Sequence, residues 1–344
     1  MLTLHFLLLS ILPLSAGVPN RQPQLAAANG QVVLTFAAGQ SIYFASSRDE
    51  GRTFGPPTKV AEVPFLAVGR HRGPRAIILK DAIVISAIAG AKPGEGDLIT
   101  WRSVDRGKTW TRAGLVNDEP NATHEGLYAM AAVAQDNLFA AWLDLRSQGT
   151  KLYGARSTDG GNTWSKNVLL YASPSGTICQ CCDPSIAIGS HGEIAVMWRN
   201  VLDGSRDLYL ASSRDGIHFG PPQKLGQGTW KLNACPMDGG GLVWDHGQLL
   251  SAWRREKDVF EARPGQPEKR LGTGKDVAIV AGKKGVYVAW SGSAGVEIIG
   301  PADAQPRKLA PEGGFVNLVA LEDGSVLAAW ESDGAIQTAK LNGQ

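Results

Sequence analysis

The chain has 344 residues, with 34 Lys and Arg against 32 Asp and Glu, and a formal net charge of +2. Acidic and basic residues are interleaved without basic runs, which argues against nucleic acid as a partner. The 42 glycines and ten tryptophans favour an all-β fold of short strands and tight turns.

The first twelve residues, Met1 to Leu12, are largely apolar, and the small residues Ser15-Ala16-Gly17 follow them. A short apolar run that ends in small residues predicts a secretory signal peptide over residues 1–17. Its n-region has no Lys or Arg, so a membrane anchor is the alternative. No later stretch is long and apolar enough to span a bilayer. We therefore expect a secreted or periplasmic monomer whose mature chain, 18–344, is one domain.

A polar turn ending in an aromatic residue recurs along the chain. Ser157–Trp164 reads S-T-D-G-G-N-T-W; Ser47–Phe54 and Ser103–Trp110 are near-copies, and Ser213–Phe219 is one residue shorter. The aspartates of these turns, Asp49, Asp105, Asp159 and Asp215, are 56, 54 and 56 residues apart. In each turn the Asp or Ser side chain can cap backbone N–H groups, and Gly supplies the positive φ. The even spacing predicts a repeat architecture.

Each repeat contains a second strand rich in Val, Ala and Trp. These strands are expected at residues 32–36, 82–88, 138–142, 194–198, 249–253, 286–290 and 326–330. Seven such strands predict seven blades of four strands each. The seventh unit has only three strands of its own. Residues around Pro23 to Ala27 are expected to complete its blade and so remove the open sheet edges.

The repeated turn S-x-D-x-G-x-T-W resembles the Asp box, or BNR repeat, of sialidases and related β-propellers. The resemblance extends over the whole chain and implies a β-propeller. It also implies that the four Asp boxes lie on outer turns, far from the mouth of the active site, and are structural. The sialidases have six blades, so a six-bladed ring with one merged repeat is the alternative to seven.

In a propeller, the loops that enter the innermost strands gather on one face with the loops that follow the second strands. Arginines, histidines, carboxylates and every cysteine fall in these loops, whereas His191 and His246 fall in turns of the opposite face. Arginine clusters suit bidentate recognition of a carboxylate or phosphate. We therefore expect a carbohydrate or another small anionic ligand on this face.

The sialidase resemblance implies roles for some of these residues. In that family three arginines bind the sugar carboxylate, an Asp is the acid/base, and a Tyr paired with a Glu is the nucleophile. Matched by position, Arg75, Arg199 and Arg254 correspond to the arginines, with Arg72 beside them. Asp183 and Asp238 are the acid/base candidates, for which capping of the strand start is an equal alternative.

Glu125 and Tyr128 are the further catalytic candidates, although a Tyr on an innermost strand more often serves packing. The family's Phe/Tyr-Arg-Ile-Pro signature is absent, and Gly73-Pro74-Arg75 only echoes it. Two functions follow. One is an exported sialidase-like glycoside hydrolase acting on an anionic sugar. The other is a non-catalytic propeller that binds a glycan, a peptide or a soft metal.

The four cysteines lie in two consecutive entry loops, Cys179, Cys181 and Cys182 in the first and Cys235 in the second. An oxidising compartment predicts disulfides between adjacent blades, one of them to Cys235, because a bond between the neighbours Cys181 and Cys182 would be strained. The alternative is a Cu or Zn site in which thiolates act together with His71, His124 or Met237. No other cofactor is expected.

Overall fold

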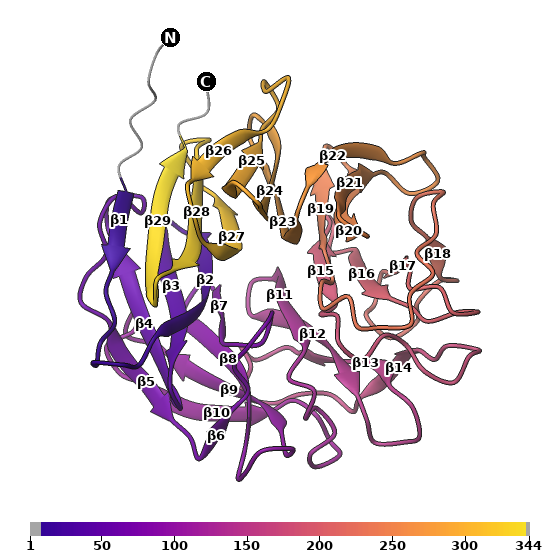
Figure 1. The fold of residues 1–344 in the computed structure, drawn as a ribbon. Coiled ribbons are helices and arrows are strands. Elements are labelled where there is room, and N and C mark those ends of the chain that lie inside the picture. The colour runs from indigo at the N-terminus through magenta and orange to yellow at the C-terminus, as the bar shows by residue number, and fades with distance from the viewer. Residues whose placement is uncertain (1–7, 342–344) are drawn as a thin grey trace.

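The computed structural model describes residues 8–341, which form 29 β-strands arranged as seven antiparallel sheets around one axis (Figure 1). The first sheet contains β2 (Asn20–Ala28), β3 (Gln31–Ala38), β4 (Ser41–Ser47) and β5 (Thr58–Glu62). The second contains β6 (Phe65–Leu66), β7 (Arg75–Ile78), β8 (Ile83–Gly90), β9 (Asp97–Ser103) and β10 (Thr111–Leu115). The third contains β11 (Tyr128–Ala134), β12 (Asn137–Asp144), β13 (Lys151–Ser157) and β14 (Val168–Tyr171). The fourth contains β15 (Ser185–Ile188), β16 (Ile194–Arg199), β17 (Leu208–Ser213) and β18 (Gln223–Lys224).

The fifth sheet contains β19 (Gly241–Asp245), β20 (Gln248–Arg255), β21 (Asp258–Ala262) and β22 (Lys269–Thr273). The sixth contains β23 (Lys275–Gly282), β24 (Gly285–Gly292), β25 (Gly295–Ile299) and β26 (Arg307–Ala310). The seventh combines β27 (Gly314–Ala320), β28 (Val326–Ser332) and β29 (Ala335–Leu341) with β1 (Leu8–Ile11). The predicted all-β, seven-bladed propeller is confirmed, and six blades are excluded. No helix within residues 8–341 could cross a membrane.

The second strand of each blade is the most deeply buried, because neighbouring blades cover both of its faces. In β16 every residue is buried, and in β3 all but the first. The Trp near the end of this strand occupies an equivalent place in five blades, and Trp142, Trp198, Trp290 and Trp330 are at most 1% exposed. Each such ring removes roughly 150–250 Å² from water, so the inter-blade layers form the core.

The ring closes through the N-terminal strand. β1 pairs antiparallel with β29, from Leu8 opposite Ala339 to Ile11 opposite Ile336, and lies beside it at the ring's edge (Figure 1). The expectation that Pro23 to Ala27 complete the last blade is wrong. These residues belong to β2, which pairs with β3 as the innermost strand of the first blade. Residues 1–7 of the predicted signal peptide lie outside the described residues, and cleavage after residue 17 stays a prediction.

Side chains also join the first blade to the last. Glu331 on β28 accepts a hydrogen bond from the backbone N–H of Gln22 at 2.6 Å and pairs with Nε of Arg21 at 2.7 Å. Asn317 on β27 accepts a hydrogen bond from the backbone N–H of Leu25 at 2.8 Å. These contacts hold β2 against the seventh blade independently of β1.

The Asp-box turns connect the third and fourth strands of four blades. In the turn of Asp159, one carboxylate oxygen accepts from Ser157 Oγ and from the backbone N–H of Thr163, and the other accepts from Thr163 Oγ1. The turns of Asp49 and Asp105 repeat this pattern. In the shorter turn, Nδ1 of His218 replaces the threonine hydroxyl, 2.7 Å from Asp215 Oδ2. All four aspartates thus accept hydrogen bonds from donors within their own turns.

Candidate functional site

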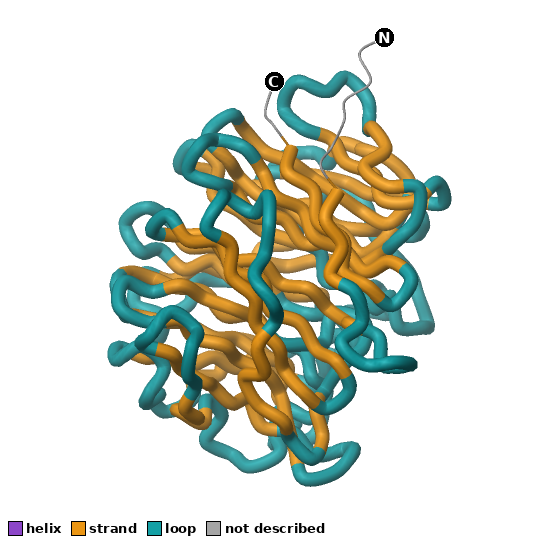
Figure 2. The backbone as a smooth tube through the Cα atoms, turned by 90° about the vertical axis from the view of Figure 1, so that its left-hand side faces the viewer, coloured by secondary structure: helices purple, strands orange, loops and turns teal. Residues whose placement is uncertain are grey.

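The innermost strands of all seven blades surround a cavity of about 410 Å³ on the axis. Its volume lies within the roughly 300–1,000 Å³ usual for small-molecule sites. The perpendicular view shows that loops cover both faces of the ring (Figure 2). The charged side chains that line the cavity are His71, Arg75 and Asp183, all from loops or strand starts at the predicted mouth.

His71 lies at the centre of a buried charged cluster. Its Nε2 is 3.2 Å from Oδ1 of Asp276, and its Nδ1 is 3.9 Å from Oδ1 of Asp183. Asp238 completes the group by accepting the backbone N–H of Asp276 at 2.8 Å. The ring of Phe315 packs edge-on against the imidazole at 5.7 Å. The cluster therefore combines one imidazole with three carboxylates from three successive blades.

The electrostatics of this cluster favour a protonated histidine. Burial opposes the charge on His71, but Asp183, Asp276 and Asp238 outweigh it and raise the pKa of the imidazole to about 9. Burial also raises the pKa of the Asp238 carboxyl, and the neighbouring Asp276 adds to the effect. For Asp276, burial is outweighed by the hydrogen bond and charge of His71, so its pKa is lowered. Strongly perturbed groups in a cavity are characteristic of functional sites.

Arg75, at the start of β7, is the cation next to this cluster. Its Nη2 is 4.0 Å from Oδ2 of Asp183, its Nε donates to the carbonyl of Tyr128 at 3.0 Å, and its guanidinium lies 5.2 Å from the centre of the Tyr128 ring. The tyrosine itself is buried. Its hydroxyl donates to the carbonyl of Ser86 at 2.7 Å, and burial raises its pKa to about 12. These contacts fix Arg75 at the cavity wall.

The other two predicted arginines lie outside the cavity. Arg199 is 1% exposed and donates to the carbonyls of Asp238, Arg206 and Arg254. Arg254 donates to the carbonyl of Glu256, and both guanidinium groups stack on Trp230 at 5.4 Å. Arg75, Arg199 and Arg254 thus do not line one cavity together.

Arg72, Glu125 and His124 belong to the neighbouring loops. Arg72 Nη2 lies 3.5 Å from Oε2 of Glu125, and its Nε donates to the Glu125 carbonyl, so the two residues pair with each other. His124 is exposed, and its Nδ1 lies 2.9 Å from the carbonyl of Asn121. None of these three residues lines the axial cavity.

Sequence reasoning missed Asp276. The residue follows Lys275 at the head of β23, with a φ of 56° in a bulge. Gln22 and Phe315 occupy the corresponding bulges of the first and last blades, with φ values of 54° and 53°. A usable signal existed, because Asp276 heads the innermost strand of its repeat much as Asp183 and Asp238 head theirs.

The cysteines form a second cluster at the same face. Sγ of Cys179 is 3.5 Å from Sγ of both Cys181 and Cys182, and all three are buried, whereas Cys235 is exposed. All four are free thiols. The predicted disulfides are therefore unsupported, since a disulfide requires about 2.05 Å between sulfurs. His71 and His124 are not among the potential metal ligands grouped here, whereas Met237 packs against the cluster.

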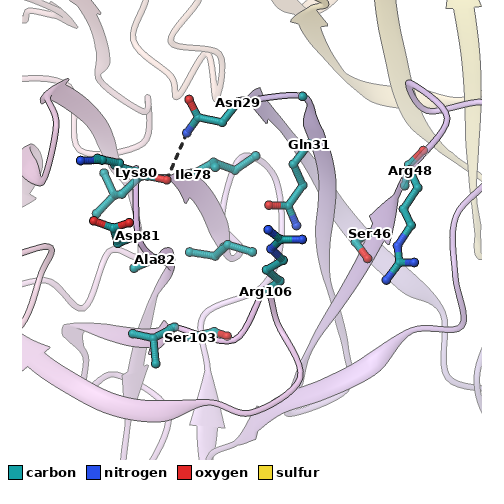
Figure 3. A pocket seen from close by; sticks show the side chains of 15 residues that line it. Asn29, Gln31, Ser46, Arg48, Ile78, Lys80, Asp81, Ala82, Ser103 and Arg106 are labelled. Carbon is teal, nitrogen blue, oxygen red and sulfur yellow. Dashed lines mark hydrogen bonds between the residues drawn. The ribbon is translucent and has the colours of Figure 1, made fainter.

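A larger cavity, of about 700 Å³, lies at the opposite face (Figure 3). It is lined by the turns around Asn29 and Lys80 and by the flanks of two Asp boxes, including Arg48 and Arg106. A hydrogen bond from Asn29 to the carbonyl of Leu79 joins the two turns. Its charged side chains are exposed. The smaller axial cavity, with its buried interacting charges, is therefore the better candidate site.

No protein-family model and no curated protein matches the sequence. Solved structures do match over nearly the whole chain. The α-L-arabinanase of Penicillium chrysogenum, complexed with arabinobiose, has a TM-score of 0.60 at 14% identity, covering 97% of this chain and 98% of that one. A PL25 ulvan lyase has a TM-score of 0.61 at 12% identity, covering 94% of each chain. The NanB sialidase of Streptococcus pneumoniae has a TM-score of 0.56 at 12% identity, covering 96% of this chain and 70% of that one. The chain shares the propeller fold of these carbohydrate-active enzymes.

Proposed function

We propose that the protein is an exported glycoside hydrolase that binds an anionic, sialic-acid-type sugar in the axial cavity. The observation that carries the proposal is the grouping of His71, Arg75 and Asp183 on the wall of one cavity, with Asp276 behind His71. Fold similarity supports it, because the neighbours include a sialidase and an arabinanase complexed with a disaccharide.

Each residue has a role that follows from its position. Arg75 and protonated His71 attract the carboxylate of the sugar. Asp183, beside both cations and at the cavity surface, transfers the proton or stabilises positive charge developing on the sugar ring. Asp238 and Asp276, buried behind the imidazole, keep His71 charged and in place.

A non-catalytic saccharide-binding propeller is the second candidate. The hydroxyl of Tyr128 is buried among backbone carbonyls, and Arg199 and Arg254 lie outside the cavity. These positions leave the expected nucleophile and two of the three expected arginines without access to the cavity, which favours binding without turnover.

A panel of fluorogenic glycosides tests both candidates, with sialoside and uronide substrates beside a neutral arabinofuranoside. Binding of the free sugars is measured in parallel by calorimetry. The hydrolase proposal expects turnover of an anionic substrate that Arg75→Ala weakens chiefly through KM and Asp183→Asn abolishes. Asp81→Asn, in the opposite cavity, is the control and retains wild-type rates. Binding without turnover supports the second candidate. If the protein shows no binding and no turnover with any of these sugars, both candidates are refuted.

A further inference from the structure

The buried cysteine cluster lies outside the saccharide site and is used by neither proposed function. Cys179, Cys181 and Cys182 bring three sulfur atoms within 4.8 Å of one another in a buried loop. The backbone N–H of Cys179 donates to the carbonyl of Arg199 at 3.0 Å, and Ile178 forms a β-bridge with Asn200. The loop is therefore attached to the rigid second strand of the fourth blade.

The distances suit three sulfurs on one ion. Thiolates at about 2.3 Å from one metal ion lie about 3.8 Å apart with tetrahedral angles and about 4.0 Å apart in a trigonal plane. The two Sγ–Sγ distances of 3.5 Å from Cys179 are near these values and far from that of a disulfide. The thioether of Met237 and the side chain of Val201 pack against the sulfurs, so this part of the lining is soft and apolar.

Two arginines supply positive charge beside the sulfurs. Arg206 donates from Nη1 to Sγ of Cys179 at 3.2 Å and from Nε to the carbonyl of Leu232. Arg199 lies next to it, with its Nη1 donating to the Arg206 carbonyl at 2.7 Å. Three thiolates, two guanidinium groups and one monovalent cation sum to zero charge. A divalent ion would leave a net positive charge, which burial disfavours.

We infer that Cys179, Cys181 and Cys182 form a trithiolate site for one monovalent copper ion, with Arg206 and Arg199 as its charge partners. Soft thiolate ligands select soft cations such as Cu(I), and the charge balance favours the monovalent ion. Binding releases the protons still held by the three thiols to solvent and needs no oxidant or reductant, because copper enters and stays as Cu(I). Cys235, in the next entry loop, is exposed and is not one of the three grouped sulfurs.

The test is an anaerobic titration of the reduced full chain with Cu(I), in competition with a chromophoric Cu(I) chelator. We expect one equivalent bound and a sulfur-only first shell in X-ray absorption. The double variant Cys179→Ser, Cys182→Ser should lower the affinity by more than about 100-fold, beyond the usual effect of outer-shell changes. Arg206→Gln should lower it about tenfold, with recovery in Arg206→Lys. Cys235→Ser is the matched control and should still bind one equivalent of Cu(I).

Alkylation of the wild-type protein keeps the proposal testable if the serine variants fold poorly. One equivalent of Cu(I) should protect Cys179, Cys181 and Cys182 from a thiol reagent, as read by peptide mass spectrometry, and leave Cys235 reactive. Absence of stoichiometric binding, unchanged affinity in the folded double variant, or unprotected thiols would overturn the site. Preferential uptake of Zn²⁺ over Cu(I) would overturn the charge argument.

Discussion

His71→Gln should weaken the folded protein at low pH and much less at high pH. In the folded state the pKa of His71 is raised from 6.5 to about 9, while an unfolded histidine titrates near its ordinary value. The folded state therefore binds the proton more tightly. The stabilisation is complete below about pH 6.5 and is lost as the pH rises through about 9. At about 1.4 kcal/mol per pKa unit, the wild type gains about 3 kcal/mol from this proton at pH 6.

Urea unfolding at pH 6, 8 and 10 measures the difference in the free energy of unfolding between the wild type and His71→Gln. We expect the gap between them to be largest at pH 6, smaller at pH 8 and nearly closed at pH 10. NMR titration of the imidazole should give the raised pKa directly. His191→Gln, whose side chain is 84% exposed on the opposite face, is the control and should show no comparable gap. A gap that does not change with pH would refute the assignment of a protonated His71 held by carboxylates.

Three further changes separate structural from functional residues. Asp159→Ala should cost about 1–2 kcal/mol of stability in chemical denaturation and leave saccharide binding unchanged, because the carboxylate serves only its own turn. Tyr128→Phe should cost about 1 kcal/mol and retain turnover, and loss of turnover at wild-type stability would instead make the hydroxyl catalytic. Glu331→Ala should lower the urea midpoint by the equivalent of about 2 kcal/mol, since it removes the contacts to Gln22 and Arg21, and an unchanged midpoint would show that these contacts do not stabilise the closed ring.

The repeats made most of the fold predictable. A second strand ending in Trp and an Asp box at even spacing define each blade, and the structure confirms seven. The closing strand was not predictable, because Leu8–Ile11 has the apolar composition of a signal peptide as well as that of an edge strand. Local sequence says nothing about a partner at the other end of the chain.

The sequence predicted which face of the propeller carries the site, but not which residues meet there. Arg75 and Arg199 both fall at the mouth, but the sequence does not show that backbone carbonyls engage the N–H groups of Arg199. The place of Asp276 at the head of an innermost strand was a usable signal, but its pairing depends on a bulge and on a histidine 205 residues away. Long-range pairing of this kind is a property of the closed ring.

The pairing of β1 with β29 has a consequence for the order of folding. Ser10 donates a hydrogen bond to Gln337, 327 residues further along, so this blade depends on one of the least local contacts in the chain. During synthesis the other six blades can form one after another, whereas β1 can pair only after β29 has been made. In a chain that keeps residues 8–11, we expect this closure to be the last and slowest step of folding, because the loop that it closes is the longest. Cleavage after residue 17 would remove β1 and leave closure to the contacts of Arg21, Gln22 and Leu25 with the seventh blade.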